Sequence, residues 1–449
     1  MEAERNAVEA ETIAHLQALI RFDTTNPPGN ELPLGEYLAG ALKRDGIETQ
    51  LLEPRPNRAQ VIARLTGNGR RRPVMLLAHM DVVGVERAKW SCDPFGGIVR
   101  DGYVYGRGAI DDKGMLSANL MAMLLIKRNV VDRGVELDRD IVFVATSDEE
   151  SGGEDGMRWL VENHPEILNA EFAINEGGRT RIIEGGKRYL AVQTAEKISH
   201  QVSVTSRGPA GHAAIPLEGN AVFELGVALA KLRDYREPVT LTPTTTRFFG
   251  DLASVWPALD VADAMRGVVS SDTAESEAAA KVLSRIPVFN AVMRNGISPV
   301  ALSGGVAGNV LPAEAKAMLN VRTIPGHRIE DVAERIAAVV SDPAITVAIE
   351  SHGEEAPGSD PDSAMFRAIS SAAKTIDPEI AVVPYLSTGG TDSAHLRRLG
   401  IIAYGILPFP MEQSDEERMH GHDERVPVES LHFGVRLIYE SIRSISLAT

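Results

Sequence analysis

The sequence predicts an α/β protein with a mostly parallel, mixed sheet flanked by helices, and with a smaller α+β domain inserted into it. Short, unbroken apolar runs, typical of strands buried on both faces, lie at 74–78, 141–146 and 172–174. Helical spacing of apolar residues over 113–128 separates the first two runs, and a strand, helix, strand order predicts parallel pairing. From about Gln193 the pattern changes to alternating polar and apolar residues, which is typical of a half-exposed antiparallel strand.

The remaining elements follow from periodicity and from residues that end helices. A helix over 8–22 ends before the prolines and glycine at 27–29, because proline cannot continue a helix. A second helix over 36–45 is closed by Gly46. The other predicted elements are strands at 48–52, 200–205, 319–322, 380–383 and 401–407, and helices at 220–232, 258–285 and 329–340.

These patterns divide the 449 residues into three segments that form two domains. Residues 1–193 begin the first domain, 194–351 form the inserted α+β domain, and 352–449 complete the first domain, because the parallel-sheet pattern returns there.

Composition excludes several classes of protein. A formal charge of −16 argues against binding the phosphate backbone of nucleic acids, which needs clustered Lys and Arg. The single cysteine, Cys92, allows no internal disulfide and fits a reducing compartment. The acidic start of the chain predicts no signal peptide, and no stretch approaches the roughly 18 apolar residues of a membrane span. We therefore expect a cytoplasmic protein without a membrane or nucleic-acid partner.

Polar side chains that bind metals or transfer protons lie at or just past the ends of the apolar runs. They are His79, Asp111, Glu149, Glu150 and Glu176. Because ligands gather at the carboxyl ends of parallel strands, we expect these side chains to converge at one edge of the sheet.

The local patterns suggest separate roles for these residues. Asp81, two residues after His79, lies on the same face of an extended segment and is placed to orient the imidazole. Either Asp111 or Asp112 could bind a metal while the other caps a helix. Of the adjacent glutamates, one can bind metal while the other handles protons.

The segment 419–425 adds imidazoles to a site that is otherwise rich in carboxylates, with His420 and His422 as alternatives. Two imidazoles and three or four carboxylates suit a pair of Zn²⁺ ions bridged by a carboxylate and a water. Such a site also admits Mn²⁺ or Co²⁺.

Together these motifs resemble the metallopeptidase family that includes glutamate carboxypeptidase, carboxypeptidase S, aminoacylase and succinyl-diaminopimelate desuccinylase. The resemblance spans almost the whole chain. The matching motifs lie at 78–83, 90–95, 106–114, 148–153, 211–212, 389–392 and 420–424.

The resemblance implies a role for each metal-site residue. Asp111 bridges two zinc ions, His79 and Glu176 each bind one ion or the other, and Glu150 and His420 complete the shell of the second ion. Glu149 corresponds to the general base and Asp81 to the residue that orients the site. The family spacing favours His420 over His422 and Asp111 over Asp112.

The resemblance also makes the inserted domain a lid and dimerisation domain of a catalytic domain. His212 would hold the substrate carbonyl, in many relatives across a dimer. The residues expected to bind the substrate and its carboxylate are Asn309, Arg322, Gly390, Thr391 and Asp392. We further expect Phe248 and Phe249 to line the pocket and His395 to be a packed helix residue.

The implied activity is hydrolysis of an amide bond next to a free carboxylate in a small substrate, either a short peptide or an N-acyl amino acid, by a homodimer. Two alternatives stay open: a deacylase of a biosynthetic N-acetyl or N-succinyl diamino acid, and a catalytically silent metal-binding dimer that acts as a binding module. Serine hydrolases and zincins are disfavoured, because neither Gly-x-Ser-x-Gly nor His-Glu-x-x-His occurs.

Overall fold

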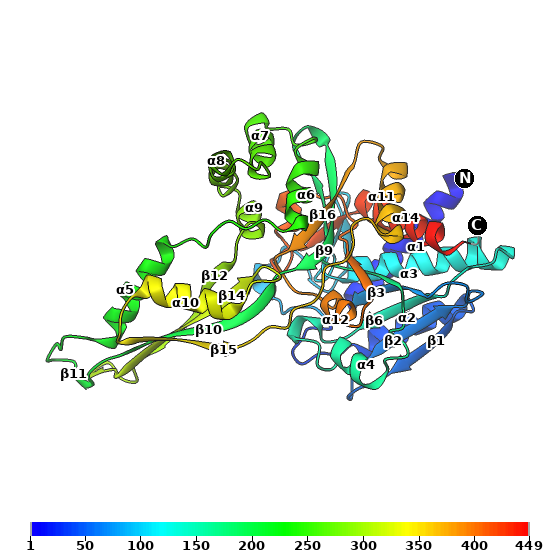
Figure 1. Ribbon diagram of the computed structural model, residues 1–449. Coiled ribbons are helices and arrows are strands. Elements are labelled where there is room, and N and C mark those ends of the chain that lie inside the picture. Colours follow the sequence, from blue (N-terminus) through cyan, green and yellow to red (C-terminus); the bar gives the residue numbers. More distant parts are fainter. Residues whose placement is uncertain (1, 448–449) are drawn as a thin grey trace.

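The chain folds around a nine-stranded sheet and a separate four-stranded sheet (Figure 1). The computed structural model describes residues 2–447, with side chains from residue 5. Met1 and 448–449 lie outside the described residues; they are the two ends of the chain that we assign to the catalytic domain. In spatial order the larger sheet contains β1 (Glu48–Leu52), β2 (Gln60–Leu65), β6 (Ile141–Thr146), β3 (Val74–His79), β7 (Phe172–Asn175), β17 (Ile402–Gly405), β9 (Arg188–Glu196) and β16 (Ala381–Ser387), with β8 (Arg179–Ile182) beside β9.

The larger sheet is mixed, with a parallel centre. Strands β6, β3, β7 and β17 pair in parallel, whereas β1 and β2 form an antiparallel edge. The predicted fold class is confirmed, and the carboxyl ends of β3, β6 and β7 meet at one edge, which is where the polar side chains were expected to converge.

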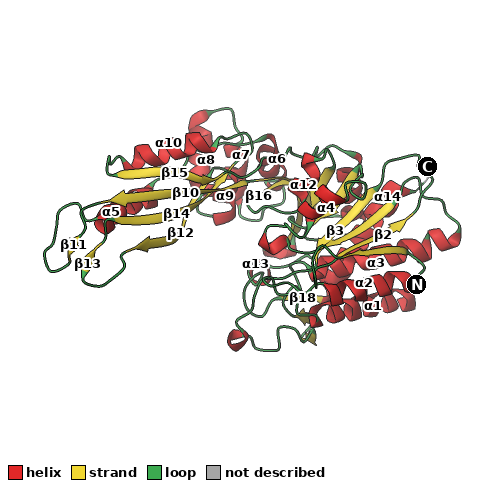
Figure 2. Cartoon of the chain, turned by 90° about the horizontal axis from the view of Figure 1, so that it is seen from below, coloured by secondary structure: helices red, strands yellow, loops and turns green. Residues whose placement is uncertain are grey.

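Helices cover both faces of this sheet, as the unbroken apolar runs predict. On β3, Leu76 packs toward α1, α3 and α14, whereas Met75 and Leu77 pack toward α4 and α12. Figure 2 shows α1, α2 and α3 together on one face. The helices of this domain are α1 (Glu2–Arg21), α2 (Leu32–Arg44), α3 (Lys113–Asn129), α4 (Met157–Asn163), α11 (Ala364–Ile376), α12 (Ser393–Arg398), α13 (Gln413–Glu416) and α14 (Val428–Ser446).

The smaller sheet is antiparallel and extends away from the larger one (Figure 1). Its order is β12 (Gly296–Gly304), β14 (Glu314–Thr323), β10 (Ile198–Arg207) and β15 (Ile345–Ser351). Alternate residues of β14 are buried beneath α5 (Ala221–Asp234) and α10 (Ile329–Val340), so one face forms a core. The two-stranded ribbon of β11 (Gly211–His212) and β13 (Val310–Leu311) lies at the far tip.

Four short helices between the strands of the smaller sheet share one apolar cluster, and the first of them packs on the larger sheet. They are α6 (Pro243–Leu252), α7 (Leu259–Val268), α8 (Thr273–Leu283) and α9 (Pro287–Val292). Phe248 and Phe249 are 2% and 0% exposed in a cluster with Phe289, Tyr189 of β9 and Tyr385 of β16. The expectation that Phe248 and Phe249 line the pocket is therefore wrong, because both rings are core residues that seal the end of the larger sheet.

A third sheet brings the C-terminal motif to the loop that carries Asp111. It consists of β4 (Ile98–Arg100), β5 (Tyr103–Tyr105) and β18 (Arg425–Pro427), and the amide of Gly106 donates to the carbonyl of Glu424 at 2.9 Å. Among residues 2–447, no helix is long and apolar enough to cross a membrane.

Candidate active site

Asp111 lies between two imidazoles from distant parts of the chain. Its Oδ1 lies 2.9 Å from His79 Nε2, at the end of β3, and its Oδ2 lies 3.0 Å from His420 Nε2. His79, Asp111 and Glu150 offer ligand atoms that all lie within 4.8 Å of one another. A carboxylate that presents one oxygen to each of two imidazoles is placed to bridge two cations.

The carboxylates of this cluster are crowded and buried. Burial raises the pKa of Glu149 well above its usual range, and it does the same for Glu176, to which the nearby charges of Glu149 and Asp111 add. For Asp111 burial acts in the same direction, but the hydrogen bonds with His420 and His79 outweigh it and hold the pKa below its usual range. A divalent cation among these groups would offset the repulsion and favour the ionised carboxylates.

One oxygen of the cluster has no donor. Glu150 Oε1 is buried and makes no hydrogen bond within the described chain, although His420 Nε2 lies 3.2 Å away outside hydrogen-bonding geometry. An unpaired buried carboxylate oxygen is costly unless a cation satisfies it. Imidazole nitrogens and carboxylate oxygens are the ligands that zinc uses, so the residues present fit a metal centre.

Asp81 holds the segment that carries the two glutamates. This fully buried carboxylate accepts hydrogen bonds from the amides of Glu149 and Glu150, both at 3.1 Å. Its backbone carbonyl lies 3.0 Å from His79 Nδ1, so the proton of that imidazole is on Nδ1 and Nε2 is free to bind a metal. Asp81 thereby fixes the positions of three site residues.

The loop that carries Asp111 is held by Glu424. This fully buried carboxylate accepts from the amides of Ile110 at 2.7 Å and Asp111 at 3.1 Å, and it pairs with Arg107 at 2.5 Å. Because Glu424 follows His420 closely in sequence, this contact also places His420 beside Asp111.

The alternatives for the metal ligands separate in space. His422 points toward Glu86, with 3.9 Å between Nε2 and Oε1, whereas His420 contacts Asp111. Asp112 is fully buried and accepts a long hydrogen bond of 3.4 Å from the backbone amide of His79. Its carboxylate therefore contacts the backbone of His79, whereas Asp111 contacts the imidazole.

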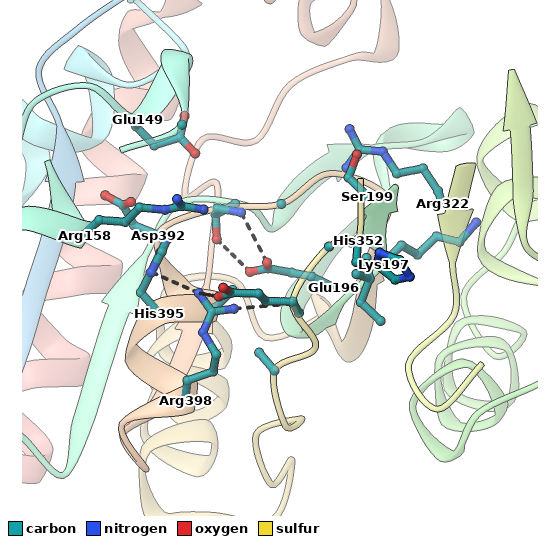
Figure 3. A pocket seen from close by; sticks show the side chains of 18 residues that line it. Glu149, Arg158, Glu196, Lys197, Ser199, Arg322, His352, Asp392, His395 and Arg398 are labelled. Atoms are coloured by element: carbon teal, nitrogen blue, oxygen red, sulfur yellow. Dashed lines mark hydrogen bonds and ion pairs between the residues drawn. The ribbon is translucent and has the colours of Figure 1, made fainter. Parts of the chain in front are cut away.

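A cavity of about 360 Å³ adjoins the cluster and is lined by residues from both the larger-sheet and the smaller-sheet parts of the chain (Figure 3). Glu149 lines it near the metal ligands, Arg322 lines it from β14, and Gly390, Thr391 and Asp392 line it from the loop before α12. Five of the predicted site residues therefore share one cavity.

Buried hydrogen bonds hold in place the loop that consists of Gly390, Thr391 and Asp392. Glu196 accepts from the hydroxyl of Thr391 at 2.7 Å and from the amide of Thr391 at 3.2 Å, and the buried Arg397 pairs with Glu196 at 3.1 Å. Asp392 accepts from the hydroxyl of Thr146 at 2.9 Å, and burial raises its pKa to about 7. The amide of Gly390 has no acceptor among residues 2–447, so it is available to a ligand.

His212 and Asn309 lie together but outside this cavity. His212 belongs to β11 and Asn309 precedes β13, at the tip of the smaller sheet. The backbone amide of Ala213 donates to the carbonyl of Asn309 at 3.0 Å, and His212 is exposed. Within one chain the structure does not bring these two residues to Glu149.

His395 differs from its expected role as a packed helix residue. It is half-buried in α12 and lines the cavity, where its Nδ1 lies 2.9 Å from Nη2 of Arg398.

Sequence reasoning missed the residues that support the site residues through hydrogen bonds and ion pairs. Glu424 was noted only for its spacing from His420, and Arg397 and Thr146 were not singled out. The side-chain Nδ2 of Asn26 donates to Asp81 at 2.8 Å and to Asp148 at 2.9 Å. Its place in a turn rich in proline was the one available signal, since a polar side chain there can reach a neighbouring strand end.

Comparisons with known proteins agree with this arrangement. The model of peptidase family M20/M25/M40 matches residues 75–444. The chain belongs to this family. It is 29% identical over 385 residues to the probable carboxypeptidase S-like 2 of Dictyostelium discoideum, covering 83% of this chain and 72% of that protein. It is 27% identical over 380 residues to the human N-fatty-acyl-amino acid synthase/hydrolase PM20D1, covering 83% and 74%.

Solved structures of the family share the fold. The M20 family metallo-carboxypeptidase Sso-CP2 from Sulfolobus solfataricus has a TM-score of 0.71 at 19% identity, covering 96% of this chain and 98% of that one. The YXEP protein of Bacillus subtilis, described as a dinuclear metal binding peptidase, has a TM-score of 0.62 at 14% identity, covering 98% and 99%. This M20 family chain is a hydrolase that acts on peptide or other linear amide bonds.

Proposed function

We propose that this M20 family protein hydrolyses an amide bond next to a free carboxylate in a small substrate, with the help of a dinuclear metal centre. The observation that carries the proposal is the position of Asp111 between His79 and His420, with Glu149 at the mouth of a cavity that also contains Arg322. Relatives named as a carboxypeptidase and as an N-acyl-amino acid hydrolase support it, because both bonds are amides of an amino acid.

In this proposal His79 and Glu176 would each hold one ion or the other, Asp111 would serve both ions, and Glu150 and His420 would complete the ligands of the second ion. Zinc fits this donor set, and Co²⁺ or Mn²⁺ are expected to substitute. When bound, two such ions lower the pKa of a water and polarise a carbonyl.

Glu149 serves as the general base. Its carboxylate takes one proton from the attacking water and then gives it to the amide nitrogen as the C–N bond breaks, so the products are a carboxylic acid and an amine. Asp81 holds the Glu149 amide in place and so keeps this carboxylate at the mouth of the cavity.

Arg322 and the loop of Gly390, Thr391 and Asp392 bind the free carboxylate. The guanidinium of Arg322 makes a hydrogen bond with Asn320 at 3.0 Å and keeps further donors for a ligand. The backbone amide of Gly390, which has no acceptor among residues 2–447, offers another donor.

His212 and Asn309 act in this proposal from the second subunit of a homodimer, because both are remote from the cavity of their own chain. The imidazole of His212 would donate to the carbonyl oxygen as negative charge develops on it. A His212→Ala protein mixed with a Glu149→Gln protein tests this arrangement. Hybrid dimers should recover part of the activity that each variant lacks, and no recovery would contradict it.

An activity panel tests the proposed function. Chelated protein should be inactive against dipeptides and N-acyl amino acids, including N-succinyl and N-acetyl diamino acids, and zinc should restore release of a free amino acid. Stoichiometric zinc binding without turnover of any panel member would favour the silent binding module instead.

A further inference from the structure

Cationic side chains line the cavity on two opposite walls. Figure 3 shows the guanidinium group of Arg322, from β14, on one side and those of Arg158 and Arg398, together with the uncharged imidazole of His395, on the other. Arg158 comes from α4 and the other two from α12, so both domains contribute positive charge. A single carboxylate on the substrate would engage only one of these walls.

The charges of the two walls are not cancelled within the protein. No carboxylate of the described chain forms an ion pair with Arg158 or Arg322, and Arg398 pairs only with Glu354, whose side chain is 68% exposed. Pairs of that kind are weak and exchange readily.

Of the four acidic residues that line the cavity, only Glu354 pairs with one of these arginines, and none of the other three forms an ion pair with Arg158, Arg322 or Arg398. Glu196 pairs with Arg397, Asp392 accepts from Thr146, and Glu149 stands beside the metal ligands. The cavity therefore keeps unsatisfied cations, and an anionic ligand would satisfy them.

His395 is placed to add a neutral donor to the second wall. A guanidinium only donates, so the contact between Arg398 Nη2 and His395 Nδ1 leaves the imidazole proton on Nε2. Burial, with the charges of Arg398 and Arg158, lowers the pKa of His395 to about 4, so the ring stays neutral at ordinary pH. Its Nε2–H and the two arginines together match the oxygens of a carboxylate.

Apolar side chains are scarce in the cavity. Among its lining residues only Ile198, Ala356 and Ala394 have apolar side chains. A large apolar amino-acid side chain would displace water from the arginines without pairing them, and such desolvation costs binding free energy. The lining thus favours a charged group in the part of the substrate that bears the free carboxylate.

We propose that the amine half of the substrate carries two carboxylates, one held by Arg322 and the loop of Gly390, the other held across the cavity by Arg158, His395 and Arg398. The amino acid released would then be acidic, of the aspartate and glutamate class. This inference rests on the proposed function and adds the identity of the amine half.

Kinetics with three substrates that share an acetyl group test it: N-acetyl-L-glutamate, N-acetyl-L-glutamine and N-acetyl-L-leucine, with zinc-loaded protein. We expect kcat/KM to favour the glutamate compound by about tenfold or more, as for a charged hydrogen bond that the neutral analogues lack. Arg158→Gln and Arg398→Gln should each lower kcat/KM for N-acetyl-L-glutamate by about tenfold, mainly through KM, and leave the glutamine compound within about twofold.

Arg233→Gln is the matched control, because Arg233 is an exposed arginine that pairs only with Asp234. It should leave all three substrates unchanged. Calorimetry provides a readout without turnover: L-glutamate should bind the zinc-loaded protein more tightly than L-glutamine, and Arg158→Gln should remove the difference.

The outcomes separate this inference from the proposed function. Zinc-dependent hydrolysis with equal or better use of N-acetyl-L-leucine would overturn the acidic preference and leave the proposed function standing. An equal loss on all substrates in Arg158→Gln would also overturn it. If no N-acyl amino acid or dipeptide is hydrolysed, both fail together.

Discussion

The carboxylate of Asp81 accepts a hydrogen bond of 3.1 Å from the backbone amide of Glu149 and another of 3.1 Å from the next amide, that of Glu150. One buried side chain therefore positions both the proposed base and a proposed metal ligand. The same residue contacts His79 through its carbonyl, so all three positions depend on one another.

Replacing Asp81 should reduce catalysis more than folding. Asp81→Ala removes the acceptor for both amides, and we expect kcat to fall by about 100-fold, as for residues that orient metal ligands. Metal content measured on the same samples should fall less, because the ligands themselves remain. Asp251→Ala, at an exposed helix position, is the control. A kcat near the wild-type value would show that Glu149 needs no such support.

The buried pair of Arg107 and Glu424 should matter for stability. Both side chains are 2% exposed or less, so Glu424→Gln leaves a buried guanidinium without its partner. We expect urea denaturation to show a loss of about 3 kcal/mol in the free energy of unfolding. The double variant with Arg107→Met should lose less than the sum of the two single changes. Additive losses would mean that the two side chains act independently.

Lys197 should make stability depend on alkaline pH. It is 3% exposed, and burial, followed by the charge of Arg322, lowers its pKa from 10.5 to about 8. Between these two values the unfolded chain therefore binds more protons than the folded chain. The free energy of unfolding consequently rises as pH increases from about 8 to 10.5, and this gain is lost as pH falls through that range to 8.

Denaturation curves at several pH values check this against Lys197→Met, which lacks the titrating group. As pH rises across that window, the free energy of unfolding of the wild-type protein should increase relative to that of the variant. Parallel profiles would exclude the shifted pKa.

Phe248 should support the fold and not the reaction. Its ring is 2% exposed and packs on Phe249, Phe289 and Tyr385. Phe248→Ala should cost about 3 to 5 kcal/mol in the free energy of unfolding, with kcat and KM of the folded fraction unchanged. If Phe248→Ala kept full stability but changed the substrate preference, Phe248 would instead line the pocket.

The part of the fold around the larger sheet could be predicted because the central strands of that sheet are apolar on both faces. The run 74–78 and its helix at 113–128 correspond to β3 and α3, and the helix predicted at 329–340 has the bounds of α10. The strand β9 was missed because its apolar run is short and flanked by polar residues, and one of its partners, β16, lies far along the chain.

The segment 258–285 shows the limit of local pattern. Its composition predicts a helix, and the structure has α7 and α8 there. Periodicity does not say what a helix packs against, so the apolar cluster that α7 and α8 share with residues of β9 and β16 could not be foreseen. The domain boundaries at 193 and 351 stay predictions, since this helical segment shares an apolar cluster with residues of the larger sheet.

The metal cluster was accessible from sequence because each ligand type stands at a strand end or in a recognisable motif. The choice of His420 over His422 came from family spacing, and in the structure His420 is the imidazole that contacts Asp111. Contacts such as that of Arg397 with Glu196 join residues about two hundred positions apart and have no local signature.

The central claim is that Glu149 moves protons at a dinuclear metal centre. The most direct measurement is kcat of Glu149→Gln, with zinc content determined on the same preparation. We expect both the wild-type protein and the variant to bind two zinc ions per chain, and the kcat of the variant to be lower by about 100-fold or more. Wild-type kcat in a variant that retains both ions would contradict it.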